Sequence, residues 1–243
     1  MKITVLGPWG AYPKAGEATA GYLLEHEDEK ILIDCGSGVL AQLQKHIQLS
    51  EVTAVIISHT HFDHIADLGC LQYACLIDTD LGNRTSILPI YMADESNNNQ
   101  YKAMSGTEIR RIAVGEALSI NELQFSFFQT FHGVYCLAVK LEFANRTFVY
   151  TADTFYDDSL VQFCANADVV IAETSFYKSF EAKKYGHMNT TDVGTLALKA
   201  NIGKVYLTHL PHFGEQASLA DEVGEIYPGP IALAYCGMEI VME

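Results

Sequence analysis

Short apolar runs, separated by glycine, proline and clusters of polar residues, recur along most of the chain. Runs of about four to eight residues rich in β-branched and aromatic side chains predict buried strands. Ala144–Asn145, between two such runs, predicts a hairpin turn. The expected strands cover residues 2–6, 18–25, 30–34, 52–58, 88–92, 109–114, 122–129, 135–143, 146–151, 168–172, 204–208, 231–235 and 238–242.

Three other segments fit the helical pattern. One follows Gly36-Ser37-Gly38 and runs to about residue 46, a second spans about 63–78, and a third spans about 190–200, opened by Thr190-Thr191-Asp192. The polar stretch Asp94–Gln100 fits either the start of a helix or a loop. Alternating strands and helices at both ends of the chain, with hairpins between, predict an α/β (α+β) fold of two sheets packed face to face with helices outside. Without a repeat or a low-complexity linker, we expect one domain over residues 1–243.

Composition fits a globular chain without a membrane segment. The chain has 243 residues, of which 49% are hydrophobic and 19% charged, enough for a sizeable core. Its apolar runs are shorter than the ~18 to 20 residues that span a membrane. The first strand begins at residue 2 and is soon broken by Gly7 and Pro8, which does not resemble a signal peptide. We therefore expect a cytoplasmic protein.

The cysteines and the net charge argue against disulfide bonds, a thiolate zinc site and a long nucleic acid as partner. The six cysteines are scattered among apolar neighbours without a Cys-x-x-Cys pair, which predicts buried, reduced thiols rather than disulfides or a thiolate zinc site. The formal net charge is −15, with only 15 basic residues. Because basic side chains supply most of the affinity for long nucleic acids, such a partner is not expected. A small anionic substrate remains compatible, since bound metal ions would set the local charge.

The run His59-Thr60-His61-Phe62-Asp63-His64 carries the clearest chemical signal. Imidazole nitrogens and carboxylate oxygens are preferred ligands of Zn²⁺ and similar divalent metals. In an extended segment His59 and His61 point to one side, whereas Asp63 and His64 would open the following helix and point elsewhere. The run therefore offers a ligand pair to each of two ions. A surface loop with histidines by chance is the alternative, but four ligand-type residues at this spacing seldom arise by chance.

Other ligand-type residues stand where predicted strands end. Asp34, His132, Asp153 and His209 each follow a mainly apolar strand. Sites in layered folds collect at the ends of parallel strands. One such residue alone would more often have a structural role. Four of them at strand ends, together with the histidine run that also follows a strand, predict a shared site.

Five segments resemble, in order, the motifs of the metallo-β-lactamase superfamily. The resemblance covers nearly the whole chain, and the His-x-His-x-Asp-His element is highly specific. It implies a four-layer αββα sandwich with a binuclear metal site. The segments are Leu32-Ile33-Asp34-Cys35-Gly36, His59 to His64, His132, Tyr150-Thr151-Ala152-Asp153-Thr154 and Leu207-Thr208-His209.

The resemblance also implies two sets of ligands and a bridging residue. Asp34 would orient a ligand instead of binding metal, although an aspartate before Gly-Ser-Gly also fits a simple turn cap. Two divalent ions are implied, with zinc expected first and manganese or iron as alternatives. One ion would take His59, His61 and His132, the other Asp63, His64 and His209, and Asp153 would bridge them.

The C-terminal third resembles the phosphodiesterase branch that includes ribonuclease Z. The segment Gly186-His187-Met188-Asn189-Thr190, followed by Leu207-Thr208-His209, is similar to that branch, in which the histidine assists catalysis. By resemblance His187 would protonate the leaving group, with Glu173 as the residue that positions it. A polar residue flanking a helix is the alternative for His187.

Two departures separate the chain from ribonuclease Z itself. The family's His-Glu-Ala-Thr segment is Ala172-Glu173-Thr174-Ser175 here, and only residues 154–172 separate Asp153 from Glu173. That interval leaves no room for the long arm with which the ribonuclease grips transfer RNA. The overall resemblance is greatest to the small YhfI-like hydrolases of this branch, through residues 16–26 and 34–40. A homodimer is plausible by resemblance alone.

The sequence hypothesis is hydrolysis of a small phosphodiester, such as a cyclic nucleotide or a short RNA-like molecule, by a hydroxide held between two ions. Asp63 would orient that hydroxide and His187 would act as general acid. A lactone, thioester or carboxylic ester hydrolase is the first alternative, because the same hydroxide can attack a carbonyl. A metal-binding regulatory protein without turnover is the second. His212, close to His209, is a further candidate for the pocket.

Overall fold

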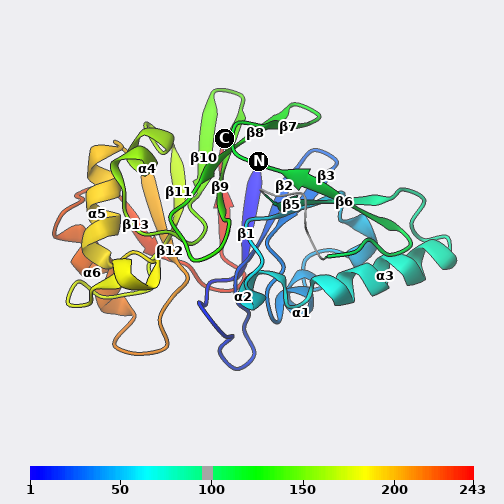
Figure 1. The fold of residues 1–243 in the computed structure, drawn as a ribbon, viewed down its shortest axis with the longest axis horizontal. Helices are drawn as coiled ribbons and strands as arrows, with labels where there is room; N and C mark the ends of the chain where they lie inside the picture. Colours follow the sequence, from blue (N-terminus) through cyan, green and yellow to red (C-terminus); the bar gives the residue numbers. More distant parts are fainter. Residues whose placement is uncertain (95–100) are drawn as a thin grey trace. The chain divides into compact units, whose positions relative to one another are not determined.

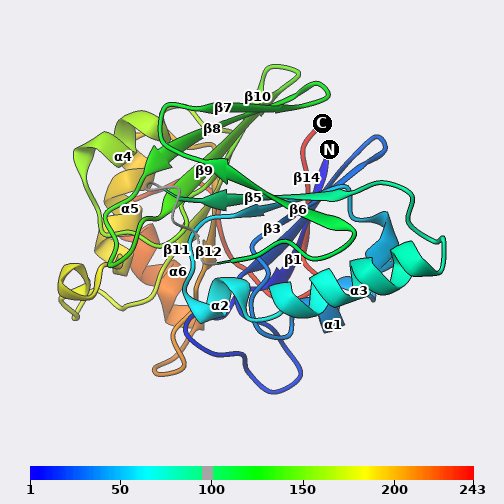
Figure 2. The ribbon, with the colours of Figure 1, turned by 45° about the vertical axis from the view of Figure 1, so that its right-hand side comes forward.

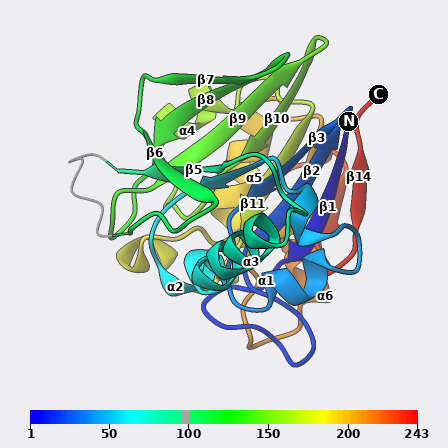
Figure 3. The same ribbon diagram turned by 90° about the vertical axis from the view of Figure 1, so that its right-hand side faces the viewer.

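The computed structural model describes residues 1–94 and 101–243, so residues 95–100 of the predicted helix start or loop at Asp94–Gln100 lie outside the described residues. The chain divides into two compact units. Unit 1 comprises Met1–Ile112 and Tyr235–Glu243, and unit 2 comprises Ala113–Ala234. The prediction of a single domain stays a prediction. Figures 1, 2 and 3 show the two sheets and their helices from three sides.

Unit 1 contains a seven-stranded sheet in the order β14-β1-β2-β3-β4-β5-β6. Pairs from β14 to β3 are antiparallel, and those from β3 to β6 are parallel. Its helices are α1 (Val39–Leu43), η1 (Leu49–Glu51), α2 (Phe62–Ile65) and α3 (Leu68–Asp80). The strands are β1 (Lys2–Gly7), β2 (Gly21–His26), β3 (Glu29–Ile33), β4 (Ala54–Ile57), β5 (Leu88–Ala93), β6 (Thr107–Ile112) and β14 (Glu239–Val241).

Unit 2 contains a second seven-stranded sheet in the order β13-β12-β11-β10-β9-β8-β7. Pairs from β13 to β10 are parallel, and those from β10 to β7 are antiparallel. Its helices are α4 (Asp158–Phe163), η2 (Ala182–Tyr185), α5 (Thr190–Lys199) and α6 (Ala217–Gly224). The strands are β7 (Ala117–Ile120), β8 (Leu123–Gln129), β9 (Leu137–Phe143), β10 (Arg146–Tyr150), β11 (Val169–Glu173), β12 (Lys204–Thr208) and β13 (Ile231–Leu233).

The apolar runs form strands because both faces of these strands are buried. All four residues of β4 are buried, and so are all five of β11. In unit 1, α1 and α3 pack on one sheet face through Val39, Leu43, Leu68 and Leu71. In unit 2, α5 buries Val193, Leu196 and Ala197, and α6 buries Leu219 and Val223. Continuous apolar runs are the expected pattern for parallel strands buried on both sides.

The predicted helix over 63–78 is two helices. α2 ends at Ile65, and α3 starts at Leu68. Asp67 lies between them, where its backbone N–H donates to the carbonyl oxygen of Cys35 at 3.1 Å and its Oδ2 accepts from the backbone N–H of Leu40 at 3.1 Å. These bonds to the segment after β3 take the place of helical ones, so the helix breaks. A separate bond, from the backbone N–H of Cys35 to the carbonyl oxygen of His64 at 2.8 Å, fixes the histidine run against the end of β3.

Strand β7 and helices α4 and α6 were not predicted from the sequence. α4 is six residues long, and its N-cap is Asp157, whose side chain accepts from the backbone N–H of Ser159. α4 is shorter than two turns and α6, with eight residues, is only slightly longer, so neither shows a clear helical period in the sequence. β7 pairs with β8 across a turn at Asn121, whose φ is 50°. Its alternating exposed and half-buried residues carry a weaker apolar signal.

All six cysteines are free thiols, as predicted, but only four of them are buried. Cys35, Cys75, Cys136 and Cys164 are buried and Cys236 is half-buried, whereas Cys70 is exposed. Cys70 lies in α3 and is exposed, so the prediction of a buried thiol was wrong there. Burial raises the pKa of Cys164 to about 12. Burial, together with the charge of Asp67, raises the pKa of Cys35 well above its usual value.

Among the described residues, no helix combines the length and the apolar character needed to cross a membrane.

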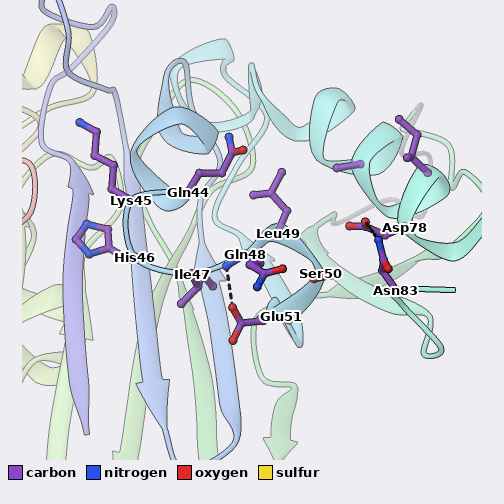
Figure 4. A pocket seen from close by; sticks show the side chains of 12 residues that line it. Gln44, Lys45, His46, Ile47, Gln48, Leu49, Ser50, Glu51, Asp78 and Asn83 are labelled. Atoms are coloured by element: carbon purple, nitrogen blue, oxygen red, sulfur yellow. Dashed lines mark hydrogen bonds between the residues drawn. The ribbon is translucent and has the colours of Figure 1, made fainter. Parts of the chain in front are cut away.

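A surface hollow of about 720 Å³ lies in unit 1 (Figure 4). The segment from Gln44 to Glu51 forms one wall, and Ile77, Asp78 and Asn83 contribute to another. The backbone N–H of Gln48 donates to Glu51 Oε2 at 2.8 Å, which caps the short helix η1. None of the predicted metal ligands lines this hollow.

Candidate metal-binding and catalytic site

In unit 1 the predicted ligands lie where β4 ends. β3 and β4 are parallel, so Asp34 and His59 follow their strands at the same sheet edge. His61 is the N-cap of α2, and Asp63 and His64 occupy that helix. His59 and His64 are fully buried, and their ring centroids are 4.0 Å apart. The end of a parallel strand followed by a short helix therefore gathers the histidine run.

Asp34 is the buried anchor of this cluster. Its backbone lies in the left-handed region, with φ at 56°, and its side chain is fully buried. Asp34 Oδ2 accepts from His64 Nδ1 at 2.7 Å and from Ser58 Oγ at 2.8 Å, and Oδ1 accepts from the Ser58 backbone N–H at 2.8 Å. Because Ser58 Oγ donates to the carboxylate, it accepts from His59 Nδ1, which lies 3.0 Å away. One carboxylate thus orients two histidine rings.

Asp63 is held by the loop after β1. The backbone N–H of Ala11 donates to Asp63 Oδ2 at 2.9 Å. The same Oδ2 lies 3.7 Å from His64 Nε2. Gly36 lets the backbone approach, since a Cβ there would lie 2.0 Å from the carbonyl oxygen of Asp63. Contacts from neighbouring segments therefore fix both the side chain and the backbone of Asp63.

In unit 2 four predicted site residues meet at the ends of the sheet's strands. β8, β10, β11 and β12 run in one direction, because β9 is antiparallel to both β8 and β10. His132 follows β8, Asp153 follows β10, Glu173 ends β11, and His209 follows β12. Their side chains are at most 8% exposed. His209 has a left-handed backbone, with φ at 52°.

Glu173 is the anchor of unit 2, as Asp34 is of unit 1. Its fully buried carboxylate accepts from His187 Nδ1 at 2.9 Å and from Ser175 Oγ at 2.7 Å. Ser175 Oγ in turn accepts from His209 Nδ1 at 2.8 Å. The His187 and His209 rings stack, with centroids 5.2 Å apart and planes at 23°. Glu173, His187 and His209 also form a cluster compact enough to hold a metal ion.

The backbone also donates to Glu173. The N–H groups of Thr154 and Met188 each reach Oε1 at 3.1 Å, and that of Ser175 reaches Oε2 at 3.2 Å. Hydrogen bonds of this kind hold a carboxylate in one orientation. Glu173 is therefore a fixed acceptor for His187.

His132 is oriented by the loop that carries His187. Its Nδ1 donates to the carbonyl oxygen of Gly186 at 3.0 Å. Gly186 has φ at 78°, and a Cβ there would lie 3.0 Å from the same Nδ1. A glycine thus gives both the left-handed turn and the close approach. The His132 and His187 ring centroids are 5.1 Å apart.

Sequence reasoning missed Ser58 and Ser175. Each serine joins a buried carboxylate to a predicted metal ligand, in the chains Asp34–Ser58–His59 and Glu173–Ser175–His209. The available signal was position, because Ser58 directly follows β4 and Ser175 lies two residues beyond β11. Serine was overlooked because it is not itself a preferred zinc ligand.

The donor set suits a divalent metal. Four of the five predicted ligand histidines direct Nδ1 at a protein oxygen, so Nε2 is the nitrogen that would coordinate a metal ion. Metal-bound histidines commonly have such a partner, which sets the tautomer and the ring orientation. In the fifth, His61 Nδ1 lies 3.2 Å from His59 Nε2. Two nitrogens on one tetrahedral zinc would be about 3.4 Å apart.

Asp153 has the position needed to contact two ligands at once. Its Oδ2 lies 3.7 Å from His132 Nε2 and 3.4 Å from His209 Nε2. Its backbone carbonyl accepts from Thr130 Oγ at 2.7 Å, which holds the loop after β10. His212, the further pocket candidate, is half-buried in the bend after β12.

Comparisons with known proteins identify relatives over nearly the whole chain. Residues 29–210 match the family described as Beta-lactamase superfamily domain, a stretch that begins in unit 1 and ends in unit 2. The chain is 38% identical over 239 residues to the probable metallo-hydrolase YhfI of Bacillus subtilis, covering 98% of each chain. It is 23% identical over 266 residues to the ribonuclease Z of Methanopyrus kandleri, covering 94% of this chain and 93% of that one.

A solved structure supports the same relationship. The crystal structure of the metallo-β-lactamase fold protein YhfI from Bacillus subtilis matches with a TM-score of 0.93 at 37% identity, over 98% of both chains. This likeness confirms the predicted fold class.

Proposed function

Because the chain belongs to the metallo-β-lactamase superfamily, we propose that it is a metal-dependent phosphodiesterase for a small, anionic phosphodiester. The family contains metallo-hydrolases, which supports hydrolysis aided by divalent metal at the general level. The choice of a phosphodiester is our proposal. It is supported by the similarity to a ribonuclease, whose substrates are phosphodiesters.

We assign the ions to the ligands that the superfamily motifs imply. One ion would be held by His59, His61 and His132 and the other by Asp63, His64 and His209, and Asp153 would serve as a ligand shared by both. The observation within each unit that supports this assignment is the orientation of the imidazoles, whose Nδ1 atoms are occupied by protein oxygens. When bound, such ions lower the pKa of a coordinated water and neutralise charge on phosphoryl oxygens.

The single observation that carries the phosphodiester proposal is the Glu173–His187 pair. A departing alkoxide is strongly basic and needs a proton, whereas the thiolate released from a thioester needs one less. Lactones and carboxylic esters also release an alkoxide, and against these substrates the proposal is supported by the similarity to a ribonuclease. His187 is 17% exposed and stacks on the predicted ligand His209, with its Nδ1 fixed by Glu173. Its Nε2 is therefore the atom that would deliver a proton to the leaving oxygen.

The other residues hold this arrangement. Ser175 ties Glu173 to His209, so the proton donor and a metal ligand share one anchor. Asp34 orients His64 directly and His59 through Ser58. Asp63, held by Ala11, is proposed to orient the attacking water. With a chain charge of −15, we propose that the substrate is small and is attracted by the metal centre, not by a basic surface.

The test is a substrate panel on protein of measured metal content. We expect metal-dependent turnover of bis-p-nitrophenyl phosphate that exceeds turnover of matched lactone, thioester and carboxylic ester substrates. A metal-loaded, folded protein that ignores the phosphodiester but cleaves a carbonyl substrate would refute the proposal in favour of an ester or lactone hydrolase. Stable metal binding without any turnover would favour a regulatory protein.

A further inference from the structure

Five aromatic side chains form a connected group in unit 2. We call Phe176, Tyr177, Phe180, Tyr185 and Phe213 the aromatic patch. The ring of Phe176 is central, with centroid distances of 5.4 Å to Tyr185, 5.9 Å to Phe180 and 6.2 Å to Phe213. Phe180 and Phe213 are 5.3 Å apart.

Three of these rings are presented to solvent. Tyr185 is 56% exposed, Phe180 44% and Phe213 43%. Large apolar side chains that are exposed together mark a binding surface more often than a structural feature. Aromatic rings also have flat faces that stack on other planar rings.

The aromatic patch borders the proposed proton donor. The Phe176 and His187 ring centroids are 6.2 Å apart. Tyr185, at the end of η2, is followed by Gly186, which binds His132, and then by His187. A side chain next to the general acid lies on the side from which the leaving group departs. A substrate bound with its departing oxygen at His187 would therefore have that part beside the aromatic patch.

The rings are held by specific contacts. Tyr177 OH donates to the carbonyl oxygen of Phe213 at 3.0 Å. Gly214, with φ at 74°, permits this approach, since a Cβ there would lie 2.5 Å from the Tyr177 ring. The planes of Phe176 and Tyr185 differ by only 15°. A surface fixed in this way loses little conformational freedom when a ligand binds.

One exposed lysine, Lys184, lies against a ring of the aromatic patch, and its neighbour Lys183 lies over Phe155, a ring outside the patch. Lys184 Nζ is 4.9 Å from the Tyr185 ring centroid, and Lys183 Nζ is 4.6 Å from that of Phe155. In a chain with a net charge of −15, a cation beside the rings, with a second lysine next to it in the sequence, favours an anionic, aromatic ligand. An aliphatic ligand would gain from burial alone, without using the flat ring faces.

We propose that the aromatic patch binds the base of a nucleotide phosphodiester by stacking, on the side of the departing alcohol. This inference rests on the proposed function and narrows it. Within small phosphodiesters, it favours nucleotides over phosphodiesters whose leaving group has no planar ring. Tyr185 and Phe180 are then specificity-determining residues.

The test compares adenosine 3′,5′-cyclic phosphate with an analogue that carries a methoxy group in place of the base. Tyr185→Leu and Phe180→Leu should each raise KM for the nucleotide by at least about fivefold and leave KM for the base-free analogue unchanged. Tyr185→Trp should keep the wild-type KM for the nucleotide, because tryptophan also offers an aromatic ring on which the base can stack. Tyr73→Leu is the matched control, since Tyr73 is 59% exposed on α3 of unit 1. It should change neither KM.

A second measurement separates this inference from the proposed function. Calorimetric titration of metal-loaded protein with adenosine, which has no phosphate, should show binding that weakens at least about fivefold in Tyr185→Leu. Turnover of both phosphodiesters with equal KM, together with no adenosine binding, would overturn the base-binding role and leave the phosphodiesterase intact. Adenosine binding that depends on Tyr185, in a protein that cleaves no phosphodiester, would support the base-binding surface and refute the phosphodiesterase.

Discussion

Replacing Asp34 by asparagine should weaken metal binding without unfolding the protein. The carboxylate accepts three hydrogen bonds, at 2.8, 2.8 and 2.7 Å, from the Ser58 backbone, Ser58 Oγ and His64 Nδ1. Asparagine has the same shape but only one accepting oxygen. If that oxygen keeps the Ser58 backbone bond, the amide nitrogen faces His64. His64 must then accept at Nδ1 and carry its proton on Nε2, the nitrogen proposed to bind metal.

The expected magnitudes follow from these contacts. Loss of an outer partner of a metal-bound histidine typically lowers metal affinity about 10- to 100-fold. The hydroxyl of Ser58 can turn and accept a hydrogen bond from the new amide, which replaces its bond to the carboxylate. The net loss is then the charge-assisted hydrogen bond between His64 Nδ1 and Asp34. The free energy of unfolding of metal-free protein should therefore fall by about 1.5–3 kcal/mol.

Metal content after dialysis, by mass spectrometry, and competition with a chelator would measure the affinity, and urea unfolding of metal-free protein would measure stability. Asp67→Asn is the matched control. Asp67 Oδ2 accepts from the Leu40 backbone N–H at 3.1 Å, in a neighbouring loop, and contacts no predicted ligand there. Two ions bound at wild-type affinity by Asp34→Asn, or equal losses in Asp67→Asn, would refute the orienting role.

Three further predictions address proton transfer, thiols and metal. Glu173→Gln should lower kcat on a substrate with an alkoxide leaving group by about 10-fold or more, because His187 loses its charged partner, and metal content should fall less; an unchanged kcat would contradict the pairing. Iodoacetamide at pH 8, followed by peptide mapping, should modify exposed Cys70 and spare buried Cys164. Burial raises the pKa of Cys164 from 9.0 in the unfolded chain to about 12 in the folded protein. The stability that this thiol contributes should therefore be fully present below pH 9 and fall as the pH rises from 9 towards 12. Rapid labelling of Cys164 in folded protein would show that its burial is wrong. Exhaustive chelation should abolish turnover and Zn²⁺ or Mn²⁺ should restore it, whereas full activity of protein shown to be metal-free would contradict metal dependence.

Much of the fold follows from apolar runs because most strands here are buried on both faces. Segments such as β4 and β11, with every residue buried, produce continuous runs that are easy to recognise. β7, with no fully buried residue, and the short helices α4 and α6 do not. The break between α2 and α3 escaped prediction because it depends on Asp67 bonding to Cys35 and Leu40, contacts far apart in sequence.

The candidate site was predictable where residue type alone carries the chemistry. Histidine and aspartate that recur at strand ends, such as His132 and Asp153, indicate metal binding because both are preferred ligands of divalent ions. Ser58 and Ser175 could not be found in this way, because serine is common at turns. Their importance lies in contacts with Asp34 and Glu173 that only a folded chain brings together.

The most direct test of the central claim is the effect of His187→Ala on two phosphodiesters that differ in leaving group, measured at equal metal content. A general acid matters most for a strongly basic alkoxide and little for p-nitrophenolate. We predict a loss in kcat of about 10²–10⁴-fold on adenosine 3′,5′-cyclic phosphate and less than about tenfold on bis-p-nitrophenyl phosphate. Equal losses on both substrates, or a loss that tracks metal content, would contradict the account of a phosphodiesterase with His187 as its proton donor.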